Sequence, residues 1–156
     1  AKTNEAHEAL SAQLKERKAL RKYVCIVNGN IKEDSGTIDK PIGRHPIDRK
    51  RMAIIEGGRE AVTHFRVLER FGMYTFVECT LETGRTHQIR AHMASIGHSI
   101  VSDPVYGIKK DREKAKGQLL HAKTIGFTHP KTGELMEFSS DPPQEFTAFL
   151  DKLRKN

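Results

Sequence analysis

The densest group of residues able to do chemistry lies in LETGRTHQIRAHM, residues 81–93. Gly84 frees the backbone where a predicted strand turns into a predicted helix, which puts Arg85 at a sheet end close to a helix N-terminus. A guanidinium there suits a carboxylate or a phosphate, because it presents a rigid fork of donors. An ordinary capped helix with Gln88 and His92 on its polar face accounts for the same pattern. From the residues alone, this plainer interpretation is slightly favoured.

Basic residues are numerous and clustered. The chain has 27 Lys and Arg against 20 Asp and Glu, a formal net charge of +7, and the excess gathers in residues 14–22, 40–52, 109–116 and 151–156. Such patches attract a polyanion and speed its capture, although a solvated basic surface has the same composition. Residues 43–51 have no helix or strand period and are expected to form a long basic surface loop. Nucleic acid is therefore the favoured partner over a membrane, because no basic stretch carries a bulky apolar face.

Other chemistries have weaker support in the sequence. The eight His residues form no HExxH pair and no CxxC occurs, so a zinc or iron site is not expected. A nuclease or glycosidase would need a carboxylate pair, and Glu78 and Glu82 are better explained as exposed strand residues. There is no glycine-rich phosphate loop and no nucleophile elbow for Ser-His-Asp catalysis.

Hydrophobic periodicity predicts an α+β scaffold beneath these residues. Strands are predicted over residues 23–27, 37–42, 61–69, 73–81, 98–102, 119–128 and 134–139, and helices over 4–18, 86–97 and from 141 onward. The strands are β-branched or alternate with period two, and two of them flank the turn at residues 130–133 as a hairpin. The expected fold is a largely antiparallel sheet with a few helices packed on it.

Two of the predicted helices have well-defined apolar faces. Thr86 is expected to cap the first of them, with Ile89, Met93 and Ile96 as its apolar stripe and Gly97 as its end. The apolar face of the last helix is expected to contain Phe146, Phe149, Leu150 and Leu153.

Length and composition indicate one domain in a reducing compartment. A chain of 156 residues suits one hydrophobic core, and no apolar run approaches the roughly 20 residues that span a bilayer. Cys25 and Cys79 each lie in an apolar run without a nearby partner, as is typical of small buried hydrophobic residues. The predicted location is cytoplasmic.

Four motifs, in order, resemble those of one enzyme family. GRTHQIRAHMASIGHSIVSDPVYG (84–107) resembles the signature of the RluA-type RNA pseudouridine synthases, especially their RluD-like branch. RKYVCIVNG (21–29) resembles the family's Arg-Lys-Tyr strand, KPIGRHPIDRKRM (40–52) its basic loop, and LLHAKTIGFTHPKTGE (119–134) its Leu-His-Ala hairpin. The resemblance implies a pseudouridine synthase fold, built on a bent, mainly antiparallel mixed sheet.

The resemblance also implies a reaction and the residues that serve it. Members isomerise uridine to pseudouridine in RNA without metal or cofactor, and the RluD-like branch acts on large-subunit ribosomal RNA. Tyr23 matches the active-site tyrosine that stacks on the uracil, and its plainer role is that of a cross-strand aromatic. Arg85 matches the arginine that pairs with the catalytic aspartate. Leu120 is the expected apolar contact of the flipped base, with Leu119 nearly as good a match.

The resemblance assigns RNA binding chiefly to the basic loop. Its expected phosphate ligands are Arg44, His45, Arg49, Lys50 and Arg51. Arg90 and His92 are weaker matches for the same work, and Arg90 has the alternative role of stabilising its helix.

The sequence departs from the family pattern in one respect. The His-Arg-Leu-Asp segment that carries the catalytic aspartate is absent, and the family pattern puts it about a dozen residues before Ala1. Asp48 lies in the basic loop, and Asp103 precedes a proline, where capping is the better explanation. Residues 1–156 are therefore expected to be a partial catalytic domain that is inactive alone.

Two other functions stay open at this stage. One is an RNA-binding module that works without chemistry, and the other is a different base-processing enzyme such as a glycosylase. Formation of pseudouridine would distinguish the synthase from the binding module, and release of free uracil would indicate the glycosylase.

Overall fold

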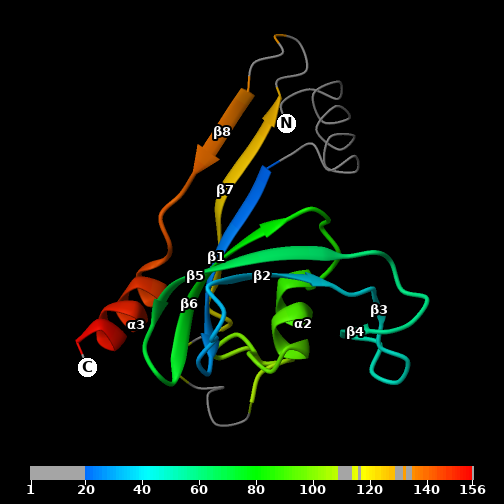
Figure 1. Ribbon diagram of the computed structural model, residues 1–156, viewed down its shortest axis with the longest axis horizontal. Helices are drawn as coiled ribbons and strands as arrows, with labels where there is room; N and C mark the ends of the chain where they lie inside the picture. The colour runs from blue at the N-terminus through cyan, green and yellow to red at the C-terminus, as the bar shows by residue number, and fades with distance from the viewer. Residues whose placement is uncertain (1–19, 109–113, 116, 129–131, 133–134, 156) are drawn as a thin grey trace.

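The computed structural model of the protein describes residues 20–108, 114–115, 117–128, 132 and 135–155. Its main element is a six-stranded sheet with the strand order β2-β5-β6-β1-β7-β8 (Figure 1). The strands are β1 (Leu20–Asn28), β2 (Ser35–Asp39), β5 (Val62–Arg70), β6 (Tyr74–Leu81), β7 (Leu120–Thr128) and β8 (Leu135–Ser139). Neighbouring strands in this sheet are antiparallel, and the helices are α2 (Gln88–Ser95) and α3 (Gln144–Arg154). The predicted α+β class is confirmed, whereas the helix predicted over residues 4–18 lies outside the described residues.

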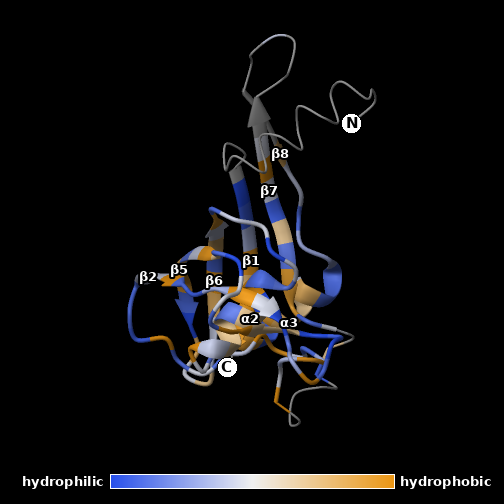
Figure 2. Cartoon of the chain, turned by 90° about the vertical axis from the view of Figure 1, so that its right-hand side faces the viewer, coloured by the Kyte–Doolittle hydropathy of each residue, from blue (hydrophilic) through white to orange (hydrophobic). Residues whose placement is uncertain are grey.

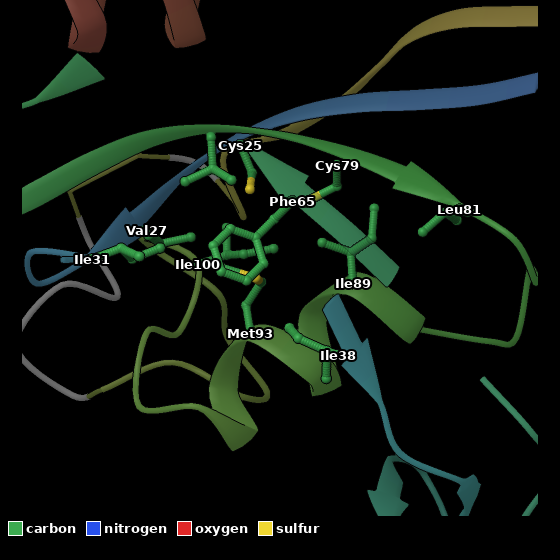
Figure 3. Packing of buried hydrophobic residues seen from close by; sticks show 11 residues of the cluster. Cys25, Val27, Ile31, Ile38, Phe65, Cys79, Leu81, Ile89, Met93 and Ile100 are labelled. Atoms are coloured by element: carbon green, nitrogen blue, oxygen red, sulfur yellow. The ribbon is translucent and has the colours of Figure 1, made fainter. Parts of the chain in front are cut away.

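Strand β1 is central and is covered on both faces. Side chains alternate along a strand, so Cys25 lies in one apolar cluster with Met93 of α2 (Figure 3), while Val24 lies in a second cluster with Phe146 of α3. This double burial explains the continuous apolar run in this strand. Both cysteines are buried and free, as predicted. In Figure 2 the start of β1, which extends beyond the helices, is hydrophilic.

The strand predicted over residues 37–42 is two separate strands. Strand β2 ends at Asp39, and β3 (Ile42–Arg44) pairs instead with β4 (Met52–Ile54) in a two-stranded sheet of its own. Pro41 lies between them and has no backbone N–H to donate. The expected long loop is therefore shorter than predicted, because its first residues belong to β3. We call residues 42–54 the basic hairpin.

The predicted cap of α2 is wrong. Helix α2 begins at Gln88, and its N-cap is His87, in the left-handed region with φ 55°, without a side-chain cap. Ile89 is buried as predicted, and the chain turns at Gly97 with φ 84°, as expected where a glycine ends a helix. The N-terminus of α2 is thus held by tertiary contacts and not by Thr86.

The last third of the chain follows the predictions with shifted boundaries. The strand predicted over residues 98–102 is a single bridge between Val27 and Ile100. Helix α3 begins at Gln144, slightly later than predicted, and its apolar face has the expected members. Phe146 and Leu150 are buried, and Phe149 and Leu153 are partly buried against the same cluster. No helix in the described part of the chain has the length and apolar composition needed to cross a membrane.

Candidate functional site

Arg85 lies just beyond the end of β6 and is held by both its backbone and its side chain. Its N–H donates to Oε1 of Gln88 at 3.0 Å, and its Nε donates to the carbonyl of Glu60 at 2.8 Å. Gln88 is itself buried, and its amide nitrogen donates to the Val62 carbonyl and to Thr63 Oγ1, both at 3.0 Å. The first residue of α2 therefore fixes the position of Arg85 against β5, a role the sequence did not reveal.

Arg21, which the sequence analysis missed, lies near both Arg85 and Tyr23. Its guanidinium lies against Gly84, where a Cβ would overlap Nη1, so a larger residue at position 84 would displace this guanidinium. Burial lowers the pKa of Arg21, Tyr23 raises it and Arg85 lowers it. Tyr23 and Arg85 therefore both lie within electrostatic range of Arg21, and the structure brings the two predicted catalytic side chains to one end of the sheet.

The two candidate leucines lie on opposite faces of the sheet. Tyr23 is opposite Ala122, and Cys25 is opposite Leu120, so Leu120 lies on the same face of the sheet as Tyr23. Both are partly buried against the cluster beneath α2. Leu119 is buried in the cluster beneath α3, on the other face. Of the two leucines, Leu120 is the one that lies on the same face as Tyr23.

A basic cavity of about 500 Å³ lies beside Arg85. Arg44 of the basic hairpin and Arg59 also line it, together with backbone from Gly43, Gly57, Gly58 and Gly84. Arg59 exchanges two backbone hydrogen bonds with Ile42, of 2.9 and 2.8 Å. None of the residues that line the cavity is acidic, so its three arginines create a positive potential suited to an anion. Arg59 could not be recognised in the sequence, because the cavity joins segments far apart in the chain.

The basic hairpin is organised by hydrogen bonds within its own loop. Arg44 donates from Nη1 to the carbonyl of Arg49 at 2.7 Å. Nδ1 of His45 accepts from the N–H groups of Ile47 and Asp48, at 3.1 and 2.9 Å. This lone pair is occupied, so His45 shapes the loop rather than offering Nδ1 to a ligand. Three of the predicted phosphate ligands, Arg44, Arg49 and Lys50, are exposed, while Arg51 is partly buried.

Arg90 and His92 are not on the surface, which corrects their predicted role in RNA binding. Arg90 forms a bidentate pair with Asp103, through Nε at 2.8 Å and Nη2 at 2.9 Å, and Asp103 is fully buried. His92 is also fully buried, with Nδ1 2.8 Å from Thr63 Oγ1 and Nε2 donating to the Lys40 carbonyl at 2.9 Å. The polar side chains of Gln88, Arg90 and His92 therefore all have partners within the protein.

The acidic residues considered in the sequence analysis have structural partners. Burial by itself would raise the pKa of Asp103, but hydrogen bonds from Arg90 and from the N–H groups of Tyr106 and Val105 lower it. Glu78, predicted to be exposed, is buried and pairs with Arg66 at 3.2 Å. No group of three or more metal-ligating side chains occurs among the described residues.

Comparisons with known proteins identify the family. A model described as RNA pseudouridylate synthase matches residues 1–95. The chain is 51% identical, over its full length, to the uncharacterized RNA pseudouridine synthase YlyB of Bacillus subtilis, and covers 51% of that protein. It is 45% identical, over 99% of its length, to the ribosomal large subunit pseudouridine synthase D of Nitrosomonas europaea, and covers 46% of that protein. The chain belongs to the RNA pseudouridylate synthase family.

Further similarities place it within that family. Relatives named ribosomal large subunit pseudouridine synthase D match at 42–46% identity, which confirms the RluA-type, RluD-like resemblance. The solved structure of human RNA pseudouridylate synthase domain containing 1 has a TM-score of 0.80 and 26% identity, over 100% of this chain and 74% of that one. The chain spans about half the length of the curated relatives it matches.

Proposed function

We propose that this chain supplies the RNA-binding surface and part of the active site of a pseudouridine synthase that acts on RNA, specifically large-subunit ribosomal RNA, in the cytoplasm. The observation that carries the proposal is the cavity lined by Arg44, Arg59 and Arg85, in a chain of this family. Its positive potential suits phosphates of a folded RNA. The names of the relatives support the substrate.

The reaction conserves all atoms and the oxidation state of its substrate. The bond between N1 of uracil and C1′ of ribose breaks, the base rotates, and C5 bonds to C1′ while its proton leaves and N1 gains one. No redox partner is required, in agreement with the predicted absence of a cofactor. The uridine must leave its stack, which costs a few kcal/mol that contacts with the protein must offset.

Each predicted catalytic side chain has a role that fits its position. Arg85 holds the carboxylate of a catalytic aspartate ionised and oriented. Tyr23 stacks on the uracil, with Leu120 beside it on the same face of the sheet. Arg21 raises the positive potential of this end of the sheet next to both Tyr23 and Arg85.

The test is pseudouridine formation in transcribed large-subunit ribosomal RNA. The protein is assayed as this chain and in the length that its gene encodes, and modified sites are read by mass spectrometry. We expect no product with the chain alone, product with the longer protein, and none after Arg85→Ala. Product from the chain alone would contradict the expectation that these 156 residues are inactive by themselves. Release of free uracil would identify a glycosylase instead.

A non-catalytic RNA-binding module is the second candidate. It is favoured by the absence of acidic residues around the arginine-lined cavity. This function predicts RNA binding by the chain and no pseudouridine at either length.

A further inference from the structure

One phenol, Tyr106, joins the basic hairpin to the start of α2. Its ring is buried, and its hydroxyl oxygen accepts the N–H of Met52, the first residue of β4, at 2.8 Å. Nδ1 of His87 lies 2.9 Å from the same oxygen. The hydroxyl therefore bridges the Met52 N–H and the imidazole of His87. Burial lowers the pKa of His87, and the nearby charge of Arg90 lowers it further, so both favour the neutral imidazole.

The ring of Tyr106 is held by two guanidinium groups. The Arg51 guanidinium lies 4.9 Å from the ring centroid and the Arg90 guanidinium lies 5.2 Å from it, both within range of a cation–π contact. Arg90 is fixed by its pair with Asp103. Oδ1 of Asp103 also accepts the backbone N–H of Tyr106 at 3.0 Å. Tyr106 is therefore held against α2 by contacts that do not depend on its hydrogen bond to the hairpin.

Besides the hydroxyl of Tyr106, the hairpin contacts the rest of the molecule through backbone hydrogen bonds with Arg59 and through apolar packing. Its two strands form a sheet separate from the main one, and outside the hairpin Ile42 forms a β-bridge with Arg59. One small apolar cluster joins Tyr106 and Ile42 to Ala91 of α2, with Met52 packed against it. The other end of β3 carries Arg44, which lines the cavity with Arg85. The angle of the hairpin thus decides how closely these two guanidiniums approach.

We propose that Tyr106 is a positioning residue: through its hydroxyl it holds the basic hairpin at the angle that keeps Arg44 beside Arg85 in one anion-binding cavity. The proposal rests on the proposed function in that the anion is the phosphate of an RNA. Without the hydroxyl, the Met52 N–H loses its acceptor in a partly buried place, so the hairpin must shift to regain one.

The test compares two identical chemical changes. Tyr106→Phe removes the hydroxyl under the hairpin, and Tyr74→Phe removes a hydroxyl that pairs with Lys114, beside the apolar cluster of α3. The affinity of each variant of the chain for transcribed ribosomal RNA is measured across salt concentrations. For Tyr106→Phe we expect about fivefold weaker binding, as for one ordinary hydrogen bond, and a shallower salt dependence as phosphate contacts are lost. Tyr74→Phe should match the wild type.

A second readout separates positioning from simple destabilisation. In the protein of the length that its gene encodes, Tyr106→Phe should raise KM for RNA about fivefold and leave kcat within about twofold of wild type. Trypsin should cleave the hairpin at residues 49–51 faster, at temperatures well below unfolding. A lower melting temperature with unchanged RNA affinity and KM would overturn the proposal, because it describes a merely structural tyrosine.

Two further outcomes are also decisive. If Tyr106→Phe does not fold, His87→Asn takes its place, since asparagine tolerates a positive φ and its side chain is too short for the phenol; RNA affinity unchanged in that variant would overturn the proposal. If the wild type forms no pseudouridine, the proposed function fails, yet the affinity comparison in the chain still tests Tyr106.

Discussion

Helix α2 and the basic hairpin contain the same residue types and use them in opposite ways. In α2, Arg90 and His92 are buried, and each has a partner far away in the sequence. In the hairpin, Arg49 and Lys50 are exposed. A family signature therefore does not by itself identify an arginine or histidine as an RNA ligand. A buried side chain interacts with partners inside the protein, whereas an exposed one is available to bind RNA.

The two regions meet at Arg85. Its backbone is fixed by the buried amide of Gln88, and its side chain lines the same cavity as Arg44. Helix α2 thus sets the position of Arg85, while the basic hairpin sets the position of Arg44. Substitutions in α2 should therefore change stability, whereas substitutions in the hairpin loop should change RNA binding.

The largest effect is expected from breaking the buried ion pair. Asp103→Ala leaves Arg90 with an uncompensated charge in a place where only 10% of its side chain is exposed. We expect the free energy of unfolding to fall by about 3–5 kcal/mol, measured by urea denaturation. Arg49→Ala, the matched exposed control, should stay within about 0.5 kcal/mol of wild type. If both variants lost the same free energy of unfolding, the proposed difference between buried residues of α2 and exposed residues of the hairpin would be wrong.

A smaller effect is expected at the contact between α2 and Arg85. Gln88→Met keeps the volume of the side chain but removes the acceptor of the Arg85 N–H and the donor to the Val62 carbonyl. The free energy of unfolding should fall by about 2 kcal/mol, the cost of buried polar groups left without partners. In the protein of the length that its gene encodes, kcat should fall as well, because Arg85 is no longer held. An unchanged kcat in a folded variant would show that Gln88 does not position Arg85.

Protonation offers a third way to compare the regions. Burial lowers the pKa of His92 and of His87 below their ordinary value of 6.5. Below that pH the unfolded chain takes up protons before the folded chain does, so stability is complete above about pH 6.5 and falls as the pH drops further. Urea unfolding between pH 7.5 and 5 should show this fall. His92→Gln should make it shallower, and the same slope in both proteins would contradict the assignment to His92.

Local pattern was sufficient for most elements of the fold and insufficient for most partners of the site residues. The strands of the main sheet and the apolar face of α3 depend on periodicity within one segment, and they were predicted apart from their boundaries, whereas residues 98–102 form only a bridge and β4 was not predicted. The cap at Thr86 was wrong, because the start of α2 is held by Tyr106 and Val62, which lie elsewhere in the chain. Tertiary contacts of this kind outweigh local preference and leave no signal at the helix itself.

The candidate site shows the same division. Arg85 and Tyr23 were predicted from motifs, and both come to one end of the sheet, beside Arg21. Arg59 follows a turn, belongs to no motif and was missed, although it lines the cavity with Arg85. The backbone bridge between Ile42 and Arg59 helps to bring this segment to the cavity.

The smallest change in stability is expected in the exposed loop, together with a clear change in binding. Arg49→Ala with Lys50→Ala removes two solvated charges, so the free energy of unfolding should change by less than about 1 kcal/mol. If both contact phosphates, the slope of log affinity against log salt concentration should become shallower by about 1.4–1.8. A double Arg66→Ala, Lys123→Ala variant removes the same charge from the sheet beside Glu78 and serves as the control. If the slope became equally shallow in both double variants, net charge alone would attract the RNA. The hairpin would then not be a preferred RNA-binding surface.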